Sequence, residues 1–245
     1  MNQKNTIRNY DDINENLRFW FSLVFDTVEN AVFYDIGAND GVFSIGFADK
    51  CRAVYAFEPA SASCRRLEER CAQGGITNIT VLPLALSESP GTLRLYRYSD
   101  DTFNSLYRRS DDQLSHYDLS EQSFEDVEVL RLDDVVAERR LPLPDVVKID
   151  IEGAELFALR GAEKTIRAAM PVILIEYSVD NTQNAGYSRD EISALLENWG
   201  YHVRGLKRNT DTTLHRGEAL ADRGIWNLLC VPPRYEALLE ARPPG

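Results

Sequence analysis

The chain has 245 residues, of which 44% are hydrophobic and 27% charged, so it can bury a sizeable core as one α/β domain. Its formal net charge of −12 disfavours nucleic acids and anionic membranes as partners, because Lys and Arg hold phosphate groups. No apolar run approaches the length of a membrane span, and the polar first residues lack the core of a signal peptide. The four cysteines show no metal-binding spacing. Together these features predict a cytoplasmic protein.

Apolar residues recur at helical spacing over residues 11–26 and predict an amphipathic helix near the start of the chain. Asp12 and Glu15 resemble a capping box for this helix. We expect residues 1–30 to pack as a helix against a single domain formed by residues 31–245. A cover over a bound cofactor or a contact in a homodimer is the alternative role, and the oligomeric state stays open.

A buried strand followed by a glycine turn is the most informative stretch of the chain. It consists of a strand over residues 31–36, the turn residues Gly37, Asn39 and Gly41, and a helix over residues 42–50. This order is typical of a nucleotide-binding unit, in which the helix N-terminus faces the ligand with unpaired N–H groups. Gly37 permits the turn, and Gly41 is expected to let the backbone come close to the ligand.

The turn differs from the dinucleotide fingerprint G-x-G-x-x-G, because Asn39 and Val42 occupy its second and third glycine positions. It fits the looser turn of an S-adenosylmethionine site, since that cofactor has no pyrophosphate to bind. Asp35, at the end of the strand, is expected to hold the methionine end of the cofactor by hydrogen bonds, directly or through water. The alternative is a tight turn that binds no ligand.

A second strand ends on an acidic residue. Residues 53–57 form a short apolar run that ends at Glu58. An acidic residue about 20 positions after the glycine turn is where a cofactor ribose is held through its hydroxyls. A helix over residues 60–73 and a strand over residues 79–84 are expected to follow, which brings Ala85 beside the adenine.

Residues 91–130 interrupt the alternation of strands and helices and are expected to form an insertion. Period-two alternation predicts a half-exposed strand over residues 91–98, and residues 127–132 return as a strand. Residues 99–126 between them are polar and irregular, which is typical of a lid or a binding loop. We expect this insertion to cover the substrate, with a mobile surface loop as the alternative. A short helix over residues 133–140 follows.

Another strand ends on two carboxylates. Starting at Asp145, it closes on Asp150 and Glu152, which point the same way if the chain stays extended. Lys148 lies within the strand and is expected to pair with a carboxylate, and the next buried strand closes on Glu176.

The remaining predicted elements are a helix over residues 154–169, a helix opened by a capping box at Ser188, strands over residues 201–203 and 225–231, a loop over residues 209–224 and a frayed tail over residues 241–245. Strands alternating with helices favour an α/β fold with a mostly parallel sheet.

Several motifs are similar to those of one family. They are Tyr34–Gly41, Phe57–Pro59, Asn104-Ser105-Leu106, Val147–Glu155 and Leu159–Ala162. Together they resemble the FkbM family of S-adenosylmethionine-dependent methyltransferases, over about residues 31–176. The resemblance implies a class I methyltransferase (Rossmann-like) fold, with a seven-stranded, mostly parallel sheet containing one antiparallel strand. It also implies O-methyl transfer to a hydroxyl of a sugar, glycan or small natural product, and it adds Ser105 to the cofactor-binding residues.

The candidate acids lie at the carboxyl ends of predicted parallel strands, which form the ligand-binding edge of an open α/β sheet. An alcohol that attacks a sulfonium methyl group must lose its proton, so a base helps. We expect Asp150 to be that base, with Glu176 as the second choice, and Asp150 also counts among the cofactor residues. His116 and His202 are less favoured, because a lone histidine is more often structural.

A metal ion is the alternative use of these acids. Asp150, Glu152 and Glu176 could hold Mg²⁺, because clustered carboxylates suit hard cations. Such an ion would orient a sugar diol and lower the pKa of its hydroxyls. We favour the base over the metal.

Three other functions compete with this one. A short-chain dehydrogenase needs Tyr-x-x-x-Lys, and no tyrosine of this chain has a lysine four positions later. A methyltransferase acting on a nucleic acid or a protein would share the cofactor site, but nucleic acid calls for a basic face. The pairs Arg108-Arg109 and Arg139-Arg140 are isolated and expected to be solvated. A non-catalytic cofactor-binding scaffold is disfavoured by the acids at the strand ends, so we expect a small-molecule or carbohydrate acceptor, with no nucleic acid and no membrane as partner.

Overall fold

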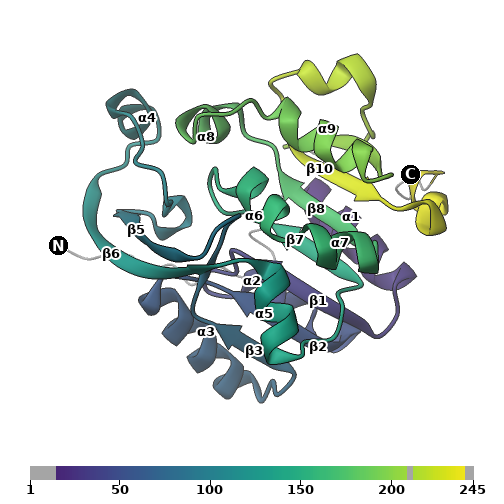
Figure 1. The fold of residues 1–245 in the computed structure, drawn as a ribbon, viewed down its shortest axis with the longest axis horizontal. Coiled ribbons are helices and arrows are strands. Elements are labelled where there is room, and N and C mark those ends of the chain that lie inside the picture. The colour runs from purple at the N-terminus through teal and green to yellow at the C-terminus, as the bar shows by residue number, and fades with distance from the viewer. Residues whose placement is uncertain (1–14, 209–211, 241–245) are drawn as a thin grey trace.

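The computed structural model describes residues 15–208 and 212–240, with a seven-stranded sheet at its centre (Figure 1). In spatial order the strands are β3 (Ile79–Leu82), β2 (Cys51–Phe57), β1 (Ala31–Ile36), β7 (Val146–Ile149), β8 (Val172–Glu176), β10 (Ile225–Val231) and β9 (His202–Lys207). Neighbours from β3 to β8 are parallel, and β10 runs antiparallel to both β8 and β9. The predicted class I methyltransferase fold, with one antiparallel strand in a mostly parallel sheet, is confirmed.

Helices cover both faces of the sheet. The helices on one face are α1 (Glu15–Thr27), α2 (Val42–Gly46) and α3 (Ser61–Gly74); those on the other, in front of the sheet in Figure 1, are α5 (Leu132–Arg139), α6 (Glu155–Gly161), α7 (Glu163–Ala169) and α9 (Asp190–Asn198). In β1, Val32 and Tyr34 face the second group, and Phe33 faces α1. The strand is therefore buried on both faces, which is why its sequence is a continuous apolar run.

Helix α1 packs on the sheet through a cluster of aromatic side chains. Trp20, Phe21 and Phe25 are at most 1% exposed, and Phe25 stacks on Phe47 with ring centroids 4.6 Å apart. The helix is described from Glu15 onward, so the predicted start at residue 11 and the capping residue Asp12 lie outside the described residues. The predicted packing of this helix on the sheet is confirmed for the part that the structure describes.

Two predicted helices are interrupted. The helix predicted over residues 42–50 ends at Gly46 and resumes as a single 3₁₀ turn, η2 (Ala48–Lys50). The helix predicted over residues 154–169 breaks at Ala162 into α6 and α7. A side chain of α5 accounts for the break. The Asp133 carboxylate accepts hydrogen bonds from the N–H groups of Lys164 and Thr165, so it satisfies the donors of a new helix N-terminus.

The insertion forms a second sheet, and it is more regular than its sequence suggests. Its strands are β4 (Ala85–Leu86), β6 (Glu121–Leu130) and β5 (Gly91–Tyr98), in that spatial order. Strand β6 begins six residues earlier than predicted, because it pairs with β5 along its whole length up to Tyr98 opposite Glu121. Between these strands lie η3 (Asp101–Phe103) and α4 (Asp111–His116), so the expectation of irregular chain through residue 126 is wrong. Exposed polar residues on β6 hide its period in the sequence.

The C-terminal part contains elements that were not predicted from the sequence. Helix α8 (Val179–Asn184) was not predicted; the Ser178 hydroxyl caps its N-terminus by accepting from the N–H of Asn181. Strand β9 extends to Lys207 instead of ending at residue 203. The predicted loop contains η4 (Gly217–Ala221), and η5 (Pro233–Glu240) follows β10. Part of that loop and the predicted tail lie outside the described residues.

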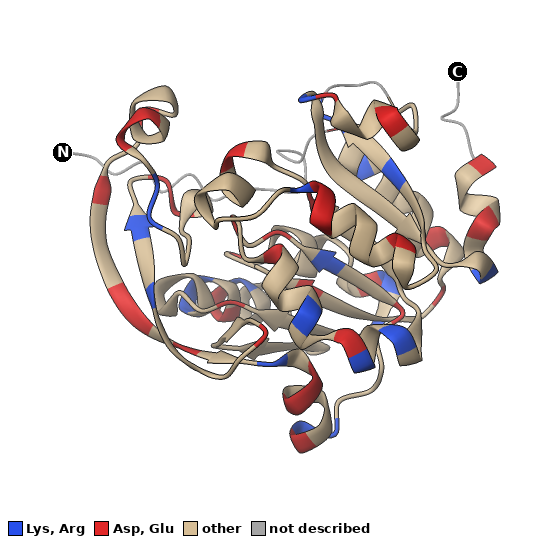
Figure 2. Ribbon diagram, turned by 45° about the horizontal axis from the view of Figure 1, so that its top comes forward, with Lys and Arg blue, Asp and Glu red and all other residues tan. Residues whose placement is uncertain are grey.

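Charged residues of both signs are interleaved over the described elements, and acidic residues predominate along β6 (Figure 2). The predicted solvation of both arginine pairs is wrong for Arg109, which is 2% exposed and buried behind Arg108. Among the residues that the structure describes, no helix has both the length and the apolar composition needed to cross a bilayer.

Candidate active site

A cavity of about 320 Å³ lies at the carboxyl ends of β1, β2, β7 and β8. Eight of the predicted site residues line it: Gly37, Asn39, Glu58, Ala85, Ser105, Asp150, Glu152 and Glu176. Asp35 and Gly41 do not line it. The cavity therefore brings together residues from four strand ends and from the insertion, which are far apart in the sequence.

Gly37 makes the close contact between the glycine turn and the end of β7. Its φ of +83° lies in the left-handed region, and an added Cβ would stand 1.9 Å from the carbonyl oxygen of Asp150. The N–H groups of Gly37 and Ala38 both donate to the carbonyl of Phe57. Glycine at this position thus sets the distance between the two halves of the cavity.

Glu58 follows β2 and is only 7% exposed. Its two carboxylate oxygens accept hydrogen bonds from the N–H groups of Asn39 and Ala60, each at 2.8 Å. Burial raises the pKa of the Glu58 carboxyl to about 7, and these two hydrogen bonds limit the rise. A carboxylate oriented in this way at a cavity wall keeps lone pairs free for a ligand hydroxyl.

Asp35 does not line the cavity, and its carboxylate has partners within the protein. Its carboxylate is fully buried and accepts from both the backbone N–H and the hydroxyl of Ser44, at 3.0 and 2.6 Å. The ammonium of Lys148 lies 3.4 Å from Asp35, 3.7 Å from Asp150 and 2.9 Å from the carbonyl oxygen of Gly37. The predicted pairing of Lys148 with a carboxylate is confirmed. Asp35 thus holds the first turn of α2 in place.

Gly41 also acts through packing. Its φ is +82°, and an added Cβ would stand 2.1 Å from a methyl carbon of Leu67 on α3. The glycine at the start of α2 therefore lets α3 approach, and the close backbone approach expected for a ligand is replaced by a contact within the protein.

Ala85 and Ser105 both line the cavity. Ala85 begins β4 and lines the cavity next to Leu84 and Leu86, so this wall is apolar. The Ser105 hydroxyl donates to the carbonyl of Glu152 at 2.7 Å and accepts from the N–H of Tyr107 at 3.0 Å. Both of its hydrogen bonds join segments of the protein, so Ser105 ties the insertion to the loop after β7.

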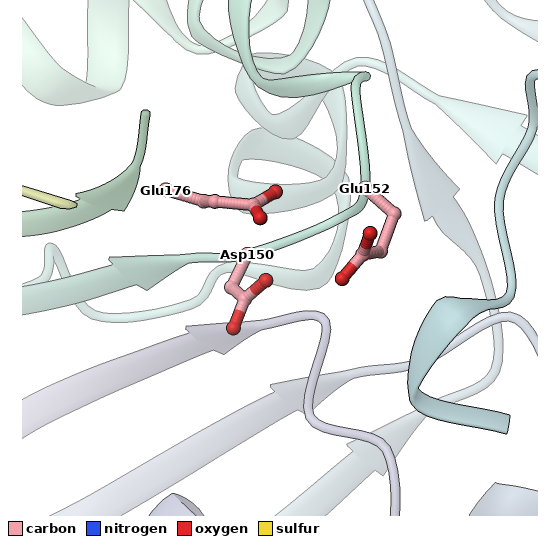
Figure 3. Close-up of side chains that lie close together, drawn as sticks. All are labelled: Asp150, Glu152 and Glu176. Atoms are coloured by element: carbon pink, nitrogen blue, oxygen red, sulfur yellow. The ribbon is translucent and has the colours of Figure 1, made fainter. Parts of the chain in front are cut away.

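The carboxylates of Asp150, Glu152 and Glu176 converge on one side of the cavity (Figure 3). One oxygen from each lies within 4.8 Å of the others. The sequence suggests an extended chain between Asp150 and Glu152. In the structure the chain turns after β7 instead, and Glu152 has a φ of +55°. Glu176 comes from the end of β8, so adjacent parallel strands bring the three acids together.

Two residues that the sequence did not single out organise these acids. Arg109, from the insertion, donates to Glu152 at 2.5 Å and to the side-chain oxygen of Asn181 at 3.0 Å. The Asn181 amide group in turn donates to Glu152 at 2.8 Å and to both oxygens of Glu176 at 3.1 Å. No local pattern marks either residue, because Arg109 and Asn181 pair with each other across 72 positions and with Glu152 across 43 and 29 positions.

Burial and mutual repulsion shift the protonation of two of the acids. The pKa of Glu176 is raised well above its usual range, first by burial and then by the nearby Glu152 and Asp150. The pKa of Glu152 is raised to about 7 by burial and Asp150, although Arg109 opposes the rise. Asp150 is more open than Glu152, with 41% of its side chain exposed against 16% for Glu152.

Neither of the less favoured histidines lines the cavity. His116 ends α4 and packs edge-on against Tyr117, which does line it. His202 lies at the start of β9, 3.7 Å from the Glu236 carboxylate. The acids are thus the proton acceptors that the cavity offers among the described residues.

Comparisons with known proteins agree with this geometry. Residues 35–203 match the methyltransferase FkbM domain. The chain is 29% identical over 193 residues to the hexuronic acid methyltransferase AglP of Haloferax volcanii, which covers 77% of this chain and 71% of that protein. It is 27% identical over 197 residues to the 31-O-demethyl-FK506 methyltransferase FkbM of Streptomyces tacrolimicus, covering 70% and 73%.

The fold comparison points the same way. A methyltransferase FkbM from Methylobacillus flagellatus KT has a TM-score of 0.54 and 18% identity to this chain, covering 91% of it and 48% of that longer chain. This likeness agrees with the order of the strands in the sheet. Because the domain match spans more than half of the sequence, the chain belongs to the FkbM family of S-adenosylmethionine-dependent methyltransferases.

Proposed function

We propose that the protein transfers a methyl group from S-adenosylmethionine to a hydroxyl oxygen of a sugar, a glycan or another small natural product. One observation carries the proposal: a single cavity connects the glycine turn and Glu58 with Asp150 and Glu176. Relatives named for hexuronic acid and for 31-O-demethyl-FK506 support an acceptor that bears hydroxyls.

The half of the cavity over β1 and β2 suits the cofactor. The volume of the whole cavity, about 320 Å³, falls within the range of small-molecule sites. Glu58 would hold the ribose hydroxyls, Gly37 and Asn39 the methionine end, and the apolar wall at Ala85 the adenine. Asp35 and Gly41 would act indirectly, by fixing α2 and α3 beside the turn. When bound, the cofactor supplies an electrophilic methyl group.

The half over β7 and β8 suits the acceptor. Asp150 is our candidate base, because it lines the cavity with 41% of its side chain exposed. The ammonium of Lys148 lies 3.7 Å from the Asp150 carboxylate. Glu176 is the weaker candidate, since both of its oxygens already accept hydrogen bonds from Asn181. Asp150 would take the proton of the acceptor hydroxyl as the oxygen attacks.

The insertion is our candidate lid. Asp101, Phe103 and Ser105 line the cavity, so residues 99–120 close one side of it. Asp101 forms an ion pair with Arg66 on α3 and also accepts a hydrogen bond from the Asn39 amide. These contacts connect the lid to the glycine turn. A closed lid would exclude water from the cavity during methyl transfer.

Calorimetry of the pure protein tests the cofactor half. We expect heat on titration with S-adenosylmethionine and with its demethylated product, S-adenosylhomocysteine, and none with NADH. Binding of NADH without binding of either nucleoside would contradict the proposal. Methyl transfer to a panel of glycosides and hydroxylated natural products, with a radiolabelled methyl group, then tests the acceptor class. Labelling of RNA or protein and of no small molecule would reverse the assignment.

Removing divalent metal ions should leave turnover unchanged. Arg109 and Asn181 already donate hydrogen bonds to Glu152, and Asn181 also donates to Glu176. These donors compete with a cation for the carboxylate oxygens. We therefore expect the same kcat after dialysis against EDTA. A loss of activity that added Mg²⁺ restores would show that Asp150, Glu152 and Glu176 hold a metal ion, in the arrangement that hard cations prefer.

Glu58 should make cofactor binding depend on pH. Burial raises the pKa of its carboxyl to about 7, and ribose hydroxyls that donate to the ionised form would lower this pKa in the complex. Binding then releases a proton near neutral pH. The affinity should rise roughly tenfold between about pH 6 and about pH 8 and level off above that range.

Calorimetry in buffers of different ionisation enthalpy measures this proton release. The Glu58→Gln variant is the control, because it cannot ionise and should lose both the proton release and the pH dependence. An affinity that stays flat across the same range in the unaltered protein would show that Glu58 does not hold the ribose through its charge.

The partners and the compartment follow from the same features. The interleaved charges in Figure 2 and the net charge of −12 favour a small acceptor over a nucleic acid. All four cysteines are buried as free thiols, which suits a reducing cytoplasm.

A further inference from the structure

Arg109 is a buried cation held in place from several sides. It is 2% exposed, and its three guanidinium nitrogens donate to three different acceptors: the carbonyl of Phe103, the Asn181 side-chain oxygen and Glu152. The guanidinium also lies over the ring of Phe103, 5.0 Å from its centroid. A planar fork with this many fixed partners has one orientation in the site.

Asn181 receives its orientation from this arginine. Its side-chain oxygen accepts from Arg109, so its NH₂ group must face the opposite way, toward Glu152 and Glu176. A flipped amide would place its oxygen against two carboxylate groups and leave the arginine facing a donor. Arg109 thus decides which end of the amide meets Glu176.

We propose that Arg109 is a positioning residue, which fixes the Asn181 amide and through it the direction of the Glu176 carboxyl group on the acceptor side of the cavity. The inference rests on the proposed function, because Glu176 borders the space assigned to the acceptor. It also assigns a second task to the lid: the segment that closes the cavity carries the residue that orders the acids.

The Arg109→Lys variant tests the geometry separately from the charge. Lysine keeps the positive charge but cannot reach three acceptors with a rigid fork. We expect kcat to fall roughly 10- to 100-fold, as small misplacements in a site can cause, with unchanged affinity for S-adenosylmethionine. The matched control is Arg108→Ala: Arg108 is adjacent, exposed and paired with Glu121, outside the cavity, and its replacement should leave kcat unchanged.

A double-mutant cycle identifies the route. If Arg109 acts through Asn181, the Arg109→Lys/Asn181→Ala variant should be no slower than the slower of the two single variants. Losses that multiply would overturn the inference, because they would give the two residues independent effects. A kcat of Arg109→Lys equal to that of Arg108→Ala would overturn it as well.

Hydrogen exchange of the Asn181 amide group can be measured without any methyl acceptor, so it tests the role of Arg109 separately from the proposed function. The Asn181 side-chain amide protons, assigned by NMR from their loss in Asn181→Ala, should exchange slowly with solvent in the unaltered protein and in Arg108→Ala. They should lose this protection in Arg109→Lys. Retained protection would overturn the inference at any level of activity, whereas failure of the unaltered protein to methylate any acceptor would overturn only the proposed function.

Discussion

Replacing Asp150 with asparagine should lower kcat by about 10²- to 10⁴-fold, the range that a positioned general base contributes. The variant keeps the shape of the side chain but cannot take the proton of the acceptor hydroxyl. Lys148 retains Asp35 and the carbonyl of Gly37 as partners, so the buried cation stays satisfied and the fold should persist. Steady-state kinetics with any acceptor that the unaltered protein methylates gives the measurement.

Two comparisons sharpen this experiment. The Kd for S-adenosylmethionine should change little in Asp150→Asn, which separates a role as base from one in cofactor binding. Glu176→Gln should cost less than Asp150→Asn, because both Glu176 oxygens already accept hydrogen bonds from Asn181. A variant Asp150→Asn with full turnover would exclude this residue as the base, and a larger loss in Glu176→Gln would transfer the role to Glu176.

Replacing Gly37 with alanine should destabilise the protein by about 2–5 kcal/mol. A left-handed backbone costs a residue with a Cβ roughly 1–2 kcal/mol, and overpacking adds about 1–3 kcal/mol. Overpacking is expected because the new Cβ would stand 1.9 Å from the Asp150 carbonyl oxygen, and backbone cannot move aside cheaply. Urea denaturation measures the change, and cofactor affinity should fall with it, since the turn must shift away from β7.

Gly75→Ala provides the matched control. Gly75 ends α3 with a φ of +65°, and an added Cβ there would meet nothing within 4 Å. That variant should show the backbone strain alone, about 1–2 kcal/mol. Equal losses in the two variants would mean that the turn and the end of β7 are not in close contact in solution.

The main strands of the sheet and the position of the acids at their ends could be predicted from the sequence. Apolar runs such as residues 31–36 are buried on both faces of the sheet, and this makes them recognisable without any tertiary information. Glu58 and Glu176 stand at strand ends in the sequence, and strands that run parallel bring such ends to one edge. The cavity, the fold and the family all follow from these local signals.

The roles of Asp35 and Gly41 could not be predicted in the same way. Both belong to the glycine turn, and a turn of this type predicts contact with a ligand. In the folded chain their nearest partners are Ser44 and Leu67, because α2 and α3 pack directly against the turn. A linear pattern does not distinguish a residue that touches a ligand from one that supports its neighbour.

What the sequence by itself determined is the α/β architecture, the turn and the set of acids, since each depends on hydrophobic periodicity or on residues close together in the chain. Only the tertiary structure decided how these acids are arranged. Arg109 and Asn181 are 72 positions apart, and neither has a neighbour in sequence that reveals its task. Their hydrogen bonds exist because the insertion folds over β7 and β8, where a buried charge must find partners and finds them in distant segments.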